Sequence, residues 1–252
     1  MKKTLLIAAS LLLLVAFAPK VNAQEEEESP WSAGLDIYSS YIWRGAKFGS
    51  GPAFQPGVSF AKGGFEIGAW GSVNASMDEG FEMDLYASYG FGPVSITVTD
   101  YYFGGDWTQY STTHYLEPSV GLSLGDFSVM GAFMFLAGTD AEAGVEEMPA
   151  KVDLTTGIIT PAVEGMDAVE ETGFGSSMDM YFEAGYSFGS VDLTLGAGNG
   201  QYTSDGDFNL CNISLGTSKE IPITESFSLP VSGAVILNPS TGGFFITVGI
   251  SL

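Results

Sequence analysis

The chain has 252 residues, with 30 acidic residues against eight basic ones and a formal net charge of −22. Phosphate contacts need a basic patch, so this charge balance argues against nucleic-acid binding. Eighteen Phe, 11 Tyr and four Trp argue against a disordered chain, and the single Cys211 excludes an intramolecular disulfide and a thiolate metal site.

An apolar leader opens the chain. Lys2 and Lys3 precede an apolar run at 5–17, and the small-residue exit Val21-Asn22-Ala23 follows. These three parts are typical of a cleaved secretion signal, so we expect residues 1–23 to be removed on export. The run is too short to cross a membrane comfortably as a helix. The mature chain would keep 229 residues (252 less 23) and a formal charge of −25, from 30 acidic and five basic residues.

The mature chain divides into an acidic tail and one β-rich domain. Residues 24–30 (QEEEESP) are expected to form a solvated periplasmic tail. From 31 to 252, apolar and polar side chains alternate, which is the period of strands with two different faces. Twelve strands are predicted, at 31–44, 53–61, 65–73, 81–90, 94–101, 114–124, 127–136, 178–188, 191–198, 209–218, 227–237 and 244–252.

The breaks between these strands alternate between short and long. Four short breaks contain Gly, at 62–64, 91–93, 125–126 and 189–190, while the break at 219–226 is longer. Gly supplies the positive φ that tight hairpin turns need. The other connections, at 45–52, 74–80, 102–113, 137–177, 199–208 and 238–243, are generally longer. Short periplasmic turns and long outer loops are typical of outer-membrane barrels, and an even strand number puts both termini in the periplasm.

The two faces of the strands distinguish a membrane barrel from a soluble sandwich only in combination with other features. Strict alternation along 81–89 and 178–188 fits a barrel with apolar side chains toward lipid, and also a β-sandwich with them inward. The export signal, the strand length, the loop asymmetry and the terminal strand favour the barrel. We therefore predict an all-β, transmembrane, antiparallel up-and-down barrel of about 12 strands in the outer membrane of a Gram-negative bacterium.

Several sequence strings resemble one family of outer-membrane proteins. DIYSSYIWRG at 36–45 is followed by GPAFQ at 51–55 and GAWGSVN at 68–74, and the end carries SKEIP at 218–222, FSLP at 227–230 and LNP at 237–239. This pattern resembles the TorF-type porins, whose start carries a Tyr-x-Trp-Arg-Gly signature. The resemblance covers the first hairpins and the last three strands, and 137–177 matches only in pattern. It implies a porin class and no particular substrate.

The face assigned to the lumen is acidic. Arg44 is its one basic residue, against the carboxylates of Asp36, Glu66, Glu82, Asp84, Glu117, Asp179, Glu183 and Asp192. Carboxylates along a narrow aqueous path lower the energy of cations and raise that of anions. The sequence therefore predicts passive, cation-preferring diffusion of small solutes or ions. The alternative is a lumen filled by its own side chains, because twelve strands enclose only a modest bore.

Arg44 closes the first predicted strand. Its guanidinium could pair with an acid of a neighbouring strand, such as Asp36, Glu66 or Asp84. We favour such a structural ion pair over the alternative, in which Arg44 binds an anionic group of a solute at the narrowest part of the pore.

Four aromatic residues near strand ends are predicted on the outward face. Trp31, Trp43, Tyr89 and Tyr186 would form the aromatic belt at the membrane interface. Outer-membrane lipid is thus an expected contact of this protein, while its oligomeric state stays open.

The segment 137–177 carries nine acidic residues against Lys151. Calcium bound by these oxygens is conceivable, but the spacing matches no EF-hand, so a solvated or lumen-folded outer loop is favoured. We expect no metal and no cofactor.

An enzyme and an accessory barrel are the remaining classes. His114 is the single His, and Leu116 stands where a serine on the same strand face would be needed, although a neighbouring strand could supply one. We therefore expect no catalytic residue and no enzyme, a lipid or peptide hydrolase being least favoured. A closed structural barrel, or an adhesin acting through its loops, is the alternative to a pore.

Overall fold

The computed structural model describes residues 29–75, 81–136, 151–153, 158–160 and 179–252. The predicted signal at 1–23 and most of the acidic tail lie outside the described residues. Twelve antiparallel strands form a closed barrel, so the predicted fold class is confirmed. In chain order the wall strands are β1 (Trp31–Tyr38), β4 (Ala53–Lys62), β5 (Phe65–Asn74), β6 (Phe81–Phe91), β7 (Val94–Tyr102), β8 (His114–Leu124), β9 (Phe127–Leu136), β12 (Asp179–Ser187), β13 (Asp192–Gly198), β14 (Asn209–Pro222), β15 (Ser228–Asn238) and β16 (Gly243–Ser251).

The barrel closes between its first and last strands. β1 pairs with β16 from Asp36–Ser251 to Tyr38–Gly249, and with β4 along its whole length. The backbone amide of Leu35 also donates to the carbonyl of Leu252 at 3.1 Å. This pairing leaves no open sheet edge, which is what lets strands cross a membrane.

The wall presents its apolar side chains outward. On β6, Phe81, Leu85 and Tyr89 are each more than 40% exposed, whereas Glu82 and Asp84 between them are 5% and 6% exposed. A soluble sandwich would bury the apolar set instead, so the arrangement is the lipid-facing one. Among the described residues, no helix is both long and apolar enough to span a membrane.

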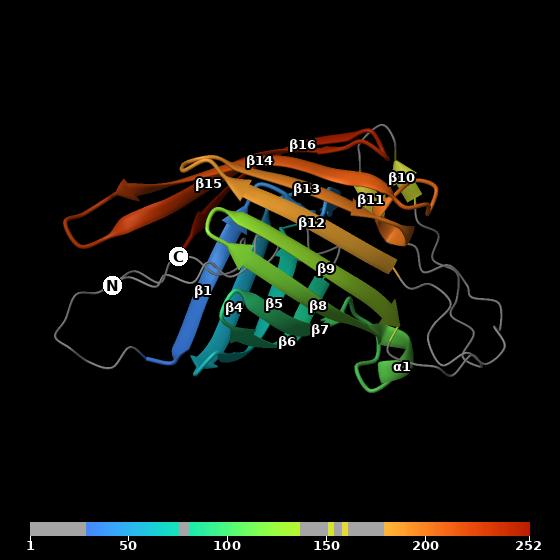
Figure 1. Cartoon of the computed structure of the whole chain (residues 1–252), viewed down its shortest axis with the longest axis horizontal. Coiled ribbons are helices and arrows are strands. Elements are labelled where there is room, and N and C mark those ends of the chain that lie inside the picture. The colour runs from blue at the N-terminus through green and yellow to red at the C-terminus, as the bar shows by residue number, and fades with distance from the viewer. Residues whose placement is uncertain (1–28, 76–80, 137–150, 154–157, 161–178) are drawn as a thin grey trace.

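Short turns and long connections lie at opposite ends of the barrel. Figure 1 shows the carboxyl terminus at the end with the short turns, and α1 (Tyr110–Thr113) and β10 (Lys151–Asp153) at the other. Gly63 and Gly64 turn with φ of 63° and 86° in the β4–β5 hairpin. The β14–β15 pairing continues to Pro222–Ser228, past the last β13–β14 pair at Gly216. The predicted long turn at 219–226 is therefore wrong in its first half, which is strand.

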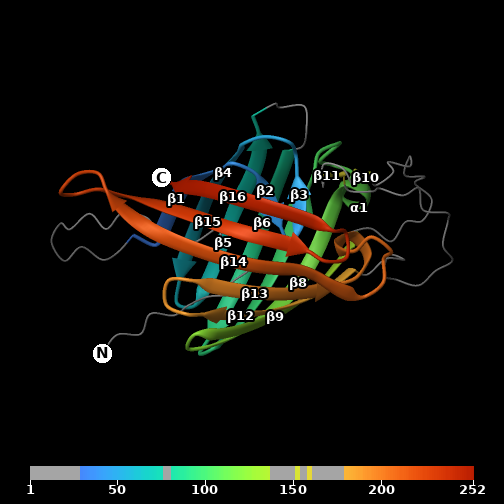
Figure 2. The same cartoon turned by 90° about the horizontal axis from the view of Figure 1, so that it is seen from above.

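The first predicted strand, 31–44, is also wrong in its second half. The wall strand ends at Tyr38, and the chain then forms a short hairpin from β2 (Tyr41–Trp43) and β3 (Ala46–Phe48), here called the lumen hairpin, residues 41–48. Figure 2 labels both strands between the barrel walls. The period of two continues across Ser39 and Ser40, so alternation alone could not mark this departure from the wall.

Part of the segment 137–177 joins the lumen hairpin. β11 (Ile158–Thr160) pairs with β10, and it pairs in parallel with β3 through Ile158 and Lys47. The four short strands make a second sheet in the order β10-β11-β3-β2. The other residues of this predicted loop lie outside the described residues.

Candidate functional site: the lumen hairpin and its cavity

The lumen hairpin turns on two residues with left-handed backbone. Arg44 has φ of 51° and Gly45 has φ of 82°, and two such residues in a row fit the tight hairpin turn that matches strand twist. A Cβ on Gly45 would fall on the carbonyl oxygen of Cys211 in β14. Glycine is thus required here for both the turn and its close approach to the wall. Arg44 carries a conformational cost of about 1 kcal/mol that its contacts must offset.

The hairpin contacts the wall on several sides. Tyr41 packs edge-on against Trp70 of β5, with ring centroids 5.5 Å apart. Ile42 packs with Ile236 of β15 and Phe245 of β16. On another side, Trp43 packs against the ring of Tyr101 of β7 at 5.7 Å, and against that of Tyr202 in the short 3₁₀ turn Gly200–Tyr202 at 5.6 Å. Residues 41–43 therefore span the lumen.

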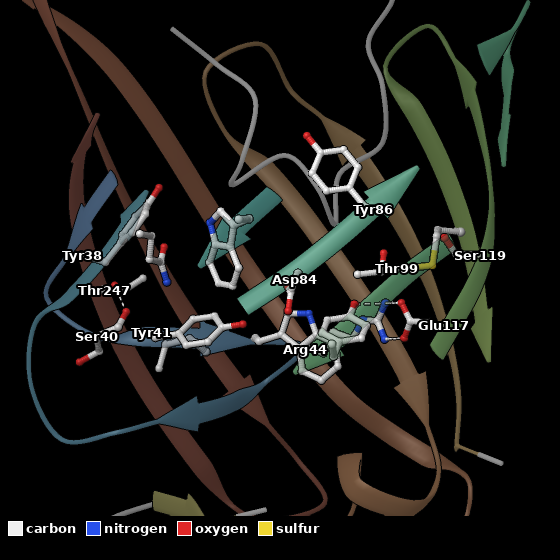
Figure 3. A pocket seen from close by; sticks show the side chains of 16 residues that line it. Tyr38, Ser40, Tyr41, Arg44, Asp84, Tyr86, Thr99, Glu117, Ser119 and Thr247 are labelled. Carbon is white, nitrogen blue, oxygen red and sulfur yellow. Dashed lines mark hydrogen bonds and ion pairs between the residues drawn. The ribbon is translucent and has the colours of Figure 1, made fainter. Parts of the chain in front are cut away.

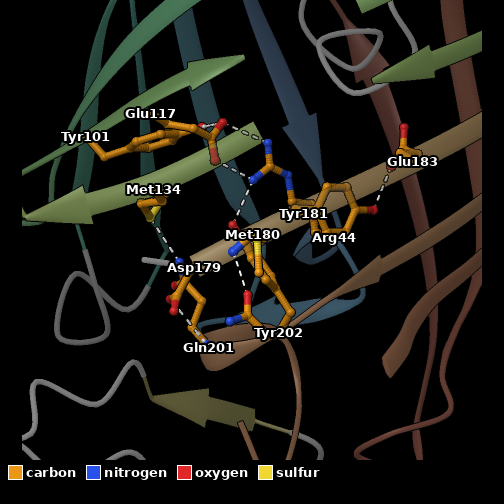
Figure 4. Close-up of polar contacts among 11 residues, drawn as sticks. Arg44, Tyr101, Glu117, Met134, Asp179, Met180, Tyr181, Glu183, Gln201 and Tyr202 are labelled. Carbon is orange, nitrogen blue, oxygen red and sulfur yellow. Dashed lines mark hydrogen bonds and ion pairs between the residues drawn. The ribbon is translucent and has the colours of Figure 1, made fainter. Parts of the chain in front are cut away.

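Arg44 fixes the tip of the hairpin to β8. Its Nη1 and Nη2 donate to the two carboxylate oxygens of Glu117 at 2.5 and 2.8 Å, and Nη1 also donates to the hydroxyl of Tyr202 at 2.7 Å (Figure 4). The guanidinium lies over the rings of Trp43 and Tyr181, at 4.4 and 4.5 Å. Two parallel hydrogen bonds and two aromatic faces form the arrangement in which arginine binds a carboxylate most specifically.

The pair is almost completely buried, with side-chain exposures of 5% for Arg44 and 3% for Glu117. Burial opposes the guanidinium charge, but the Glu117 carboxylate and Tyr202 outweigh it, so the pKa of Arg44 is raised well above its ordinary value. Arg44 therefore stays charged at every pH the barrel meets. Its expected partners Asp36, Glu66 and Asp84 were the wrong ones, because the hairpin carries Arg44 across the lumen to β8.

Tyrosine hydroxyls donate hydrogen bonds to four of the predicted lumen acids. Each of the following pairs is a hydroxyl donating to a carboxylate: Tyr41 to Glu82 at 3.2 Å, Tyr86 to Glu66 at 2.9 Å, Tyr181 to Glu183 at 2.7 Å, and Tyr101 to Glu117 at 3.2 Å. The sequence pattern alone does not predict these donors. The sequence feature that could have revealed them is the presence of Tyr on the polar face of strands such as 81–89.

The remaining acids lie apart from the hairpin tip. Asp179, at the start of β12, accepts from the backbone amide of Gln201 at 3.3 Å. Asp36 is half-buried near the β1–β16 seam, and Asp192 is exposed at the start of β13. The structure thus brings Glu82, Asp84 and Glu117 together around the hairpin.

Trp43 is a correction to the predicted aromatic belt. It lies inside the barrel against Tyr101 and Tyr202, and not at the lipid interface, because the chain leaves the wall before reaching it. Trp31, Tyr89 and Tyr186 are 65%, 51% and 44% exposed on wall strands β1, β6 and β12.

A cavity of about 90 Å³ lies between the lumen hairpin and the wall of β5–β8. Figure 3 shows the Asp84 side chain between Tyr41 and the Arg44–Glu117 pair. The lining includes Tyr41, Trp43 and Arg44 from the hairpin and, from the wall, Trp70, Asp84, Tyr86, Tyr101 and Glu117. Three buried polar atoms of this lining, Oδ1 of Asp84, the indole Nε1 of Trp70 and Nε of Arg44, make no hydrogen bond within the described residues.

His114 lies outside the lumen, on the face of β8 that carries the exposed Val120. Its Nδ1 is 2.9 and 3.0 Å from the two oxygens of Asp100, and its Nε2 is 3.3 Å from the carbonyl oxygen of Trp107. The rings of Trp107 and Tyr110 cover it, and its side chain is fully buried. Oxygen atoms thus lie within hydrogen-bond distance of both ring nitrogens. Within the described part of the chain, no group of three or more His, Cys, Asp or Glu is arranged to hold a metal.

No family model and no curated protein matches the chain. Among solved structures, a mutant of the Rhodopseudomonas blastica porin is 11% identical over 79% of this chain and 55% of that one, with a TM-score of 0.36. Outer membrane phospholipase A from Escherichia coli is 14% identical over 88% and 91%, at 0.39. OccK9 (OpdG) from Pseudomonas aeruginosa is 13% identical over 90% and 64%, at 0.35.

The chain folds as a closed antiparallel β-barrel of twelve strands. It spans about half the length of the R. blastica porin, 55% of that chain. Likenesses at these identities and TM-scores assign no family, and the resemblance to the TorF-type porins stays a prediction.

Proposed function

We propose that this barrel is a narrow, cation-preferring pore of the TorF type for passive diffusion of small solutes across the outer membrane. The observation that carries the proposal is the unbalanced charge of the lumen. Of the eight predicted lumen carboxylates, Glu117 alone forms an ion pair within the described residues. Fixed negative charge beside a narrow path attracts cations and excludes anions.

The lumen hairpin narrows the path in this proposal. It contacts opposite walls, and its tip is fixed by a buried pair at Arg44 and Glu117. The same observation favours a second candidate, a closed barrel that acts as an accessory or adhesive protein through its outer loops. The two candidates differ in whether solutes cross at all.

We propose no catalytic activity. A hydrolase of the Ser–His type needs a histidine that accepts a proton from the nucleophile. His114 is fully buried, and oxygen atoms of Asp100 and Trp107 engage both of its ring nitrogens. No Ser or Thr hydroxyl of the described residues hydrogen-bonds to it. These contacts support a structural role at the outer rim.

Liposome swelling tests the pore against the closed barrel. Purified protein in liposomes is exposed to three solutes of similar size: a small ammonium salt, a neutral polyol and a carboxylate. The expected order of entry is cation, then neutral solute, then anion. Replacing Glu183 with Gln should weaken the preference, because Glu183 is a buried lumen carboxylate, whereas Asp192→Asn at an exposed position serves as the control.

Entry of the anion at the same rate as the cation would refute the charge argument. Entry of none of the three, together with recovery of a stoichiometric partner from the native membrane, would support the closed barrel.

A further inference from the structure

Three residues of neighbouring strands form one row on the lumen wall. In the register of the barrel, Trp70 of β5 is directly opposite Asp84 of β6, which is directly opposite Tyr101 of β7. Directly paired residues share a face, so all three side chains point into the lumen. Trp70, Asp84 and Tyr101 are each 6% exposed, and all three line the cavity beneath the hairpin.

Asp84 lacks a partner in this row. Its Oδ1 makes no hydrogen bond and the carboxylate forms no ion pair within the described residues. A buried carboxylate without a partner is costly unless it takes up a proton, and a nearby ligand that supplies a donor or a positive charge stabilises its charged form. Arg44 lines the same cavity; both of its terminal nitrogens are bonded to Glu117, and its Nε makes no hydrogen bond within the described residues.

The charges and rings around Asp84 select a cation. Glu82 and Glu117 are further buried carboxyl groups in contact with the lumen hairpin, and the guanidinium of Arg44 is paired with Glu117. Tyr41 closes the row from the hairpin, where its ring packs on Trp70. Aromatic faces attract cations, and they suit organic ammonium groups better than metal ions that need several oxygen ligands.

The unpaired hydrogen-bond donors on the cavity wall indicate which kind of ligand the cavity would bind. The indole Nε1 of Trp70 and Nε of Arg44 are donors without a partner, and Oδ1 of Asp84 is an acceptor without one, on the same cavity. A ligand that carries both an ammonium group and an oxygen acceptor would donate to Asp84 and accept from one of the two donors, of which Trp70 is the uncharged one. The volume of about 90 Å³ exceeds the space that one water needs, so the cavity admits a molecule of a few heavy atoms.

We propose that the cavity between the lumen hairpin and the Trp70–Asp84–Tyr101 row is a binding site for a small hydroxylated organic ammonium ion. The ammonium group sits at Asp84 and the oxygen accepts from Trp70. This inference rests on the proposed cation-preferring pore. It names the class of solute that binds in the lumen during passage through the barrel.

Isothermal titration of the full-length protein in detergent with ethanolamine hydrochloride tests the site. Wild-type protein is expected to bind ethanolamine and to show no heat with ethylene glycol, its neutral counterpart. Asp84→Asn, which keeps the shape of the side chain, should weaken binding by about tenfold or more, because a charge-assisted hydrogen bond is lost. Trp70→Phe should weaken it less. Asp192→Asn, at an exposed carboxylate that does not line the cavity, is the matched control and should bind as the wild type does.

Equal binding by the wild type and Asp84→Asn would overturn the proposal, as would no binding by the wild type. Displacement of ethanolamine by equimolar potassium chloride would show an inorganic cation site and overturn the ligand class. The pore is measured separately by liposome swelling. Cation entry without ethanolamine binding refutes the site alone, and binding without entry refutes the pore alone.

Discussion

Replacing Arg44 with Ala should release the lumen hairpin. The substitution leaves Glu117 buried without its cation, and breaking a buried pair in this way costs about 3–5 kcal/mol. It also removes the guanidinium from the faces of Trp43 and Tyr181, at about 0.5–2 kcal/mol each. Alanine keeps the left-handed φ of residue 44, so no strain is recovered. We expect the docked state to lose about 3 kcal/mol or more, which shifts the docking equilibrium by at least about a hundredfold.

Two measurements detect this release. Hydrogen exchange of the amides at 41–48 should accelerate in Arg44→Ala, while the amides of the wall strands keep their protection because the barrel ladder is intact. Single-channel current should rise in parallel. Arg44→Lys keeps the charge but loses the bidentate geometry and the stacking, so its effect should be intermediate.

A double-mutant cycle separates the pair from the rest of the hairpin. Adding Glu117→Gln to Arg44→Ala removes the unpaired charge, so the double variant should exchange more slowly at 41–48 than the sum of the single effects predicts. Unchanged exchange and unchanged current in Arg44→Ala would refute the reasoning. That outcome would mean that the apolar contacts of Ile42 hold the hairpin without the ion pair.

Further predictions concern the turn of the hairpin and one outer loop. Gly45→Ala should also undock the hairpin in the exchange assay, because its Cβ meets the carbonyl of Cys211, whereas Gly63→Ala, at a positive φ in open space, should cost only about 1 kcal/mol of stability. Equal effects of Gly45→Ala and Gly63→Ala would contradict the claim that the close contact of Gly45 with the Cys211 carbonyl requires glycine. Hydrogen bonds from the Thr108 side chain and backbone lower the pKa of Asp106, so the loop 103–113 gains stability above the usual aspartate range and loses it as pH falls through the lowered pKa. Exchange of the loop amides should accelerate at acid pH in the wild type and lose this dependence in Asp106→Asn; a pH dependence that survives in the variant would refute the assignment.

The wall of the barrel was predictable from the sequence because neighbouring residues in the chain determine both the alternation of each strand and the position of its tight turns. Each strand alternates between lipid and lumen, and the predicted strands at 114–124 and 127–136 match β8 and β9 residue for residue. Tight turns carry their own signal in Gly, as at Gly63 and Gly64.

The lumen hairpin was not predictable from the same pattern. Trp43 has the parity of the outward residues of β1, and nothing local shows that the chain has left the wall. Its real environment comes from Tyr101 and Tyr202, which are distant in sequence. The Arg44–Glu117 pair likewise joins residues 73 positions apart, so it depends on the closed barrel and its register.

The structure gives a physical meaning to the Tyr-x-Trp-Arg-Gly string. Tyr41 packs on Trp70, Trp43 stacks on Arg44, Arg44 binds Glu117, and Gly45 permits the turn against β14. All four residues act in the lumen hairpin. A string that seemed to end a membrane strand instead encodes an element inside the barrel.

The reversal potential of the purified protein in a planar bilayer, under a gradient of potassium chloride, tests the central claim most directly. We predict the sign of a cation-selective pore, with a larger current and the same sign in Arg44→Ala, since the remaining lumen carboxylates set the selectivity. An anion-selective reversal potential, or no current from either protein, would contradict a cation-preferring pore.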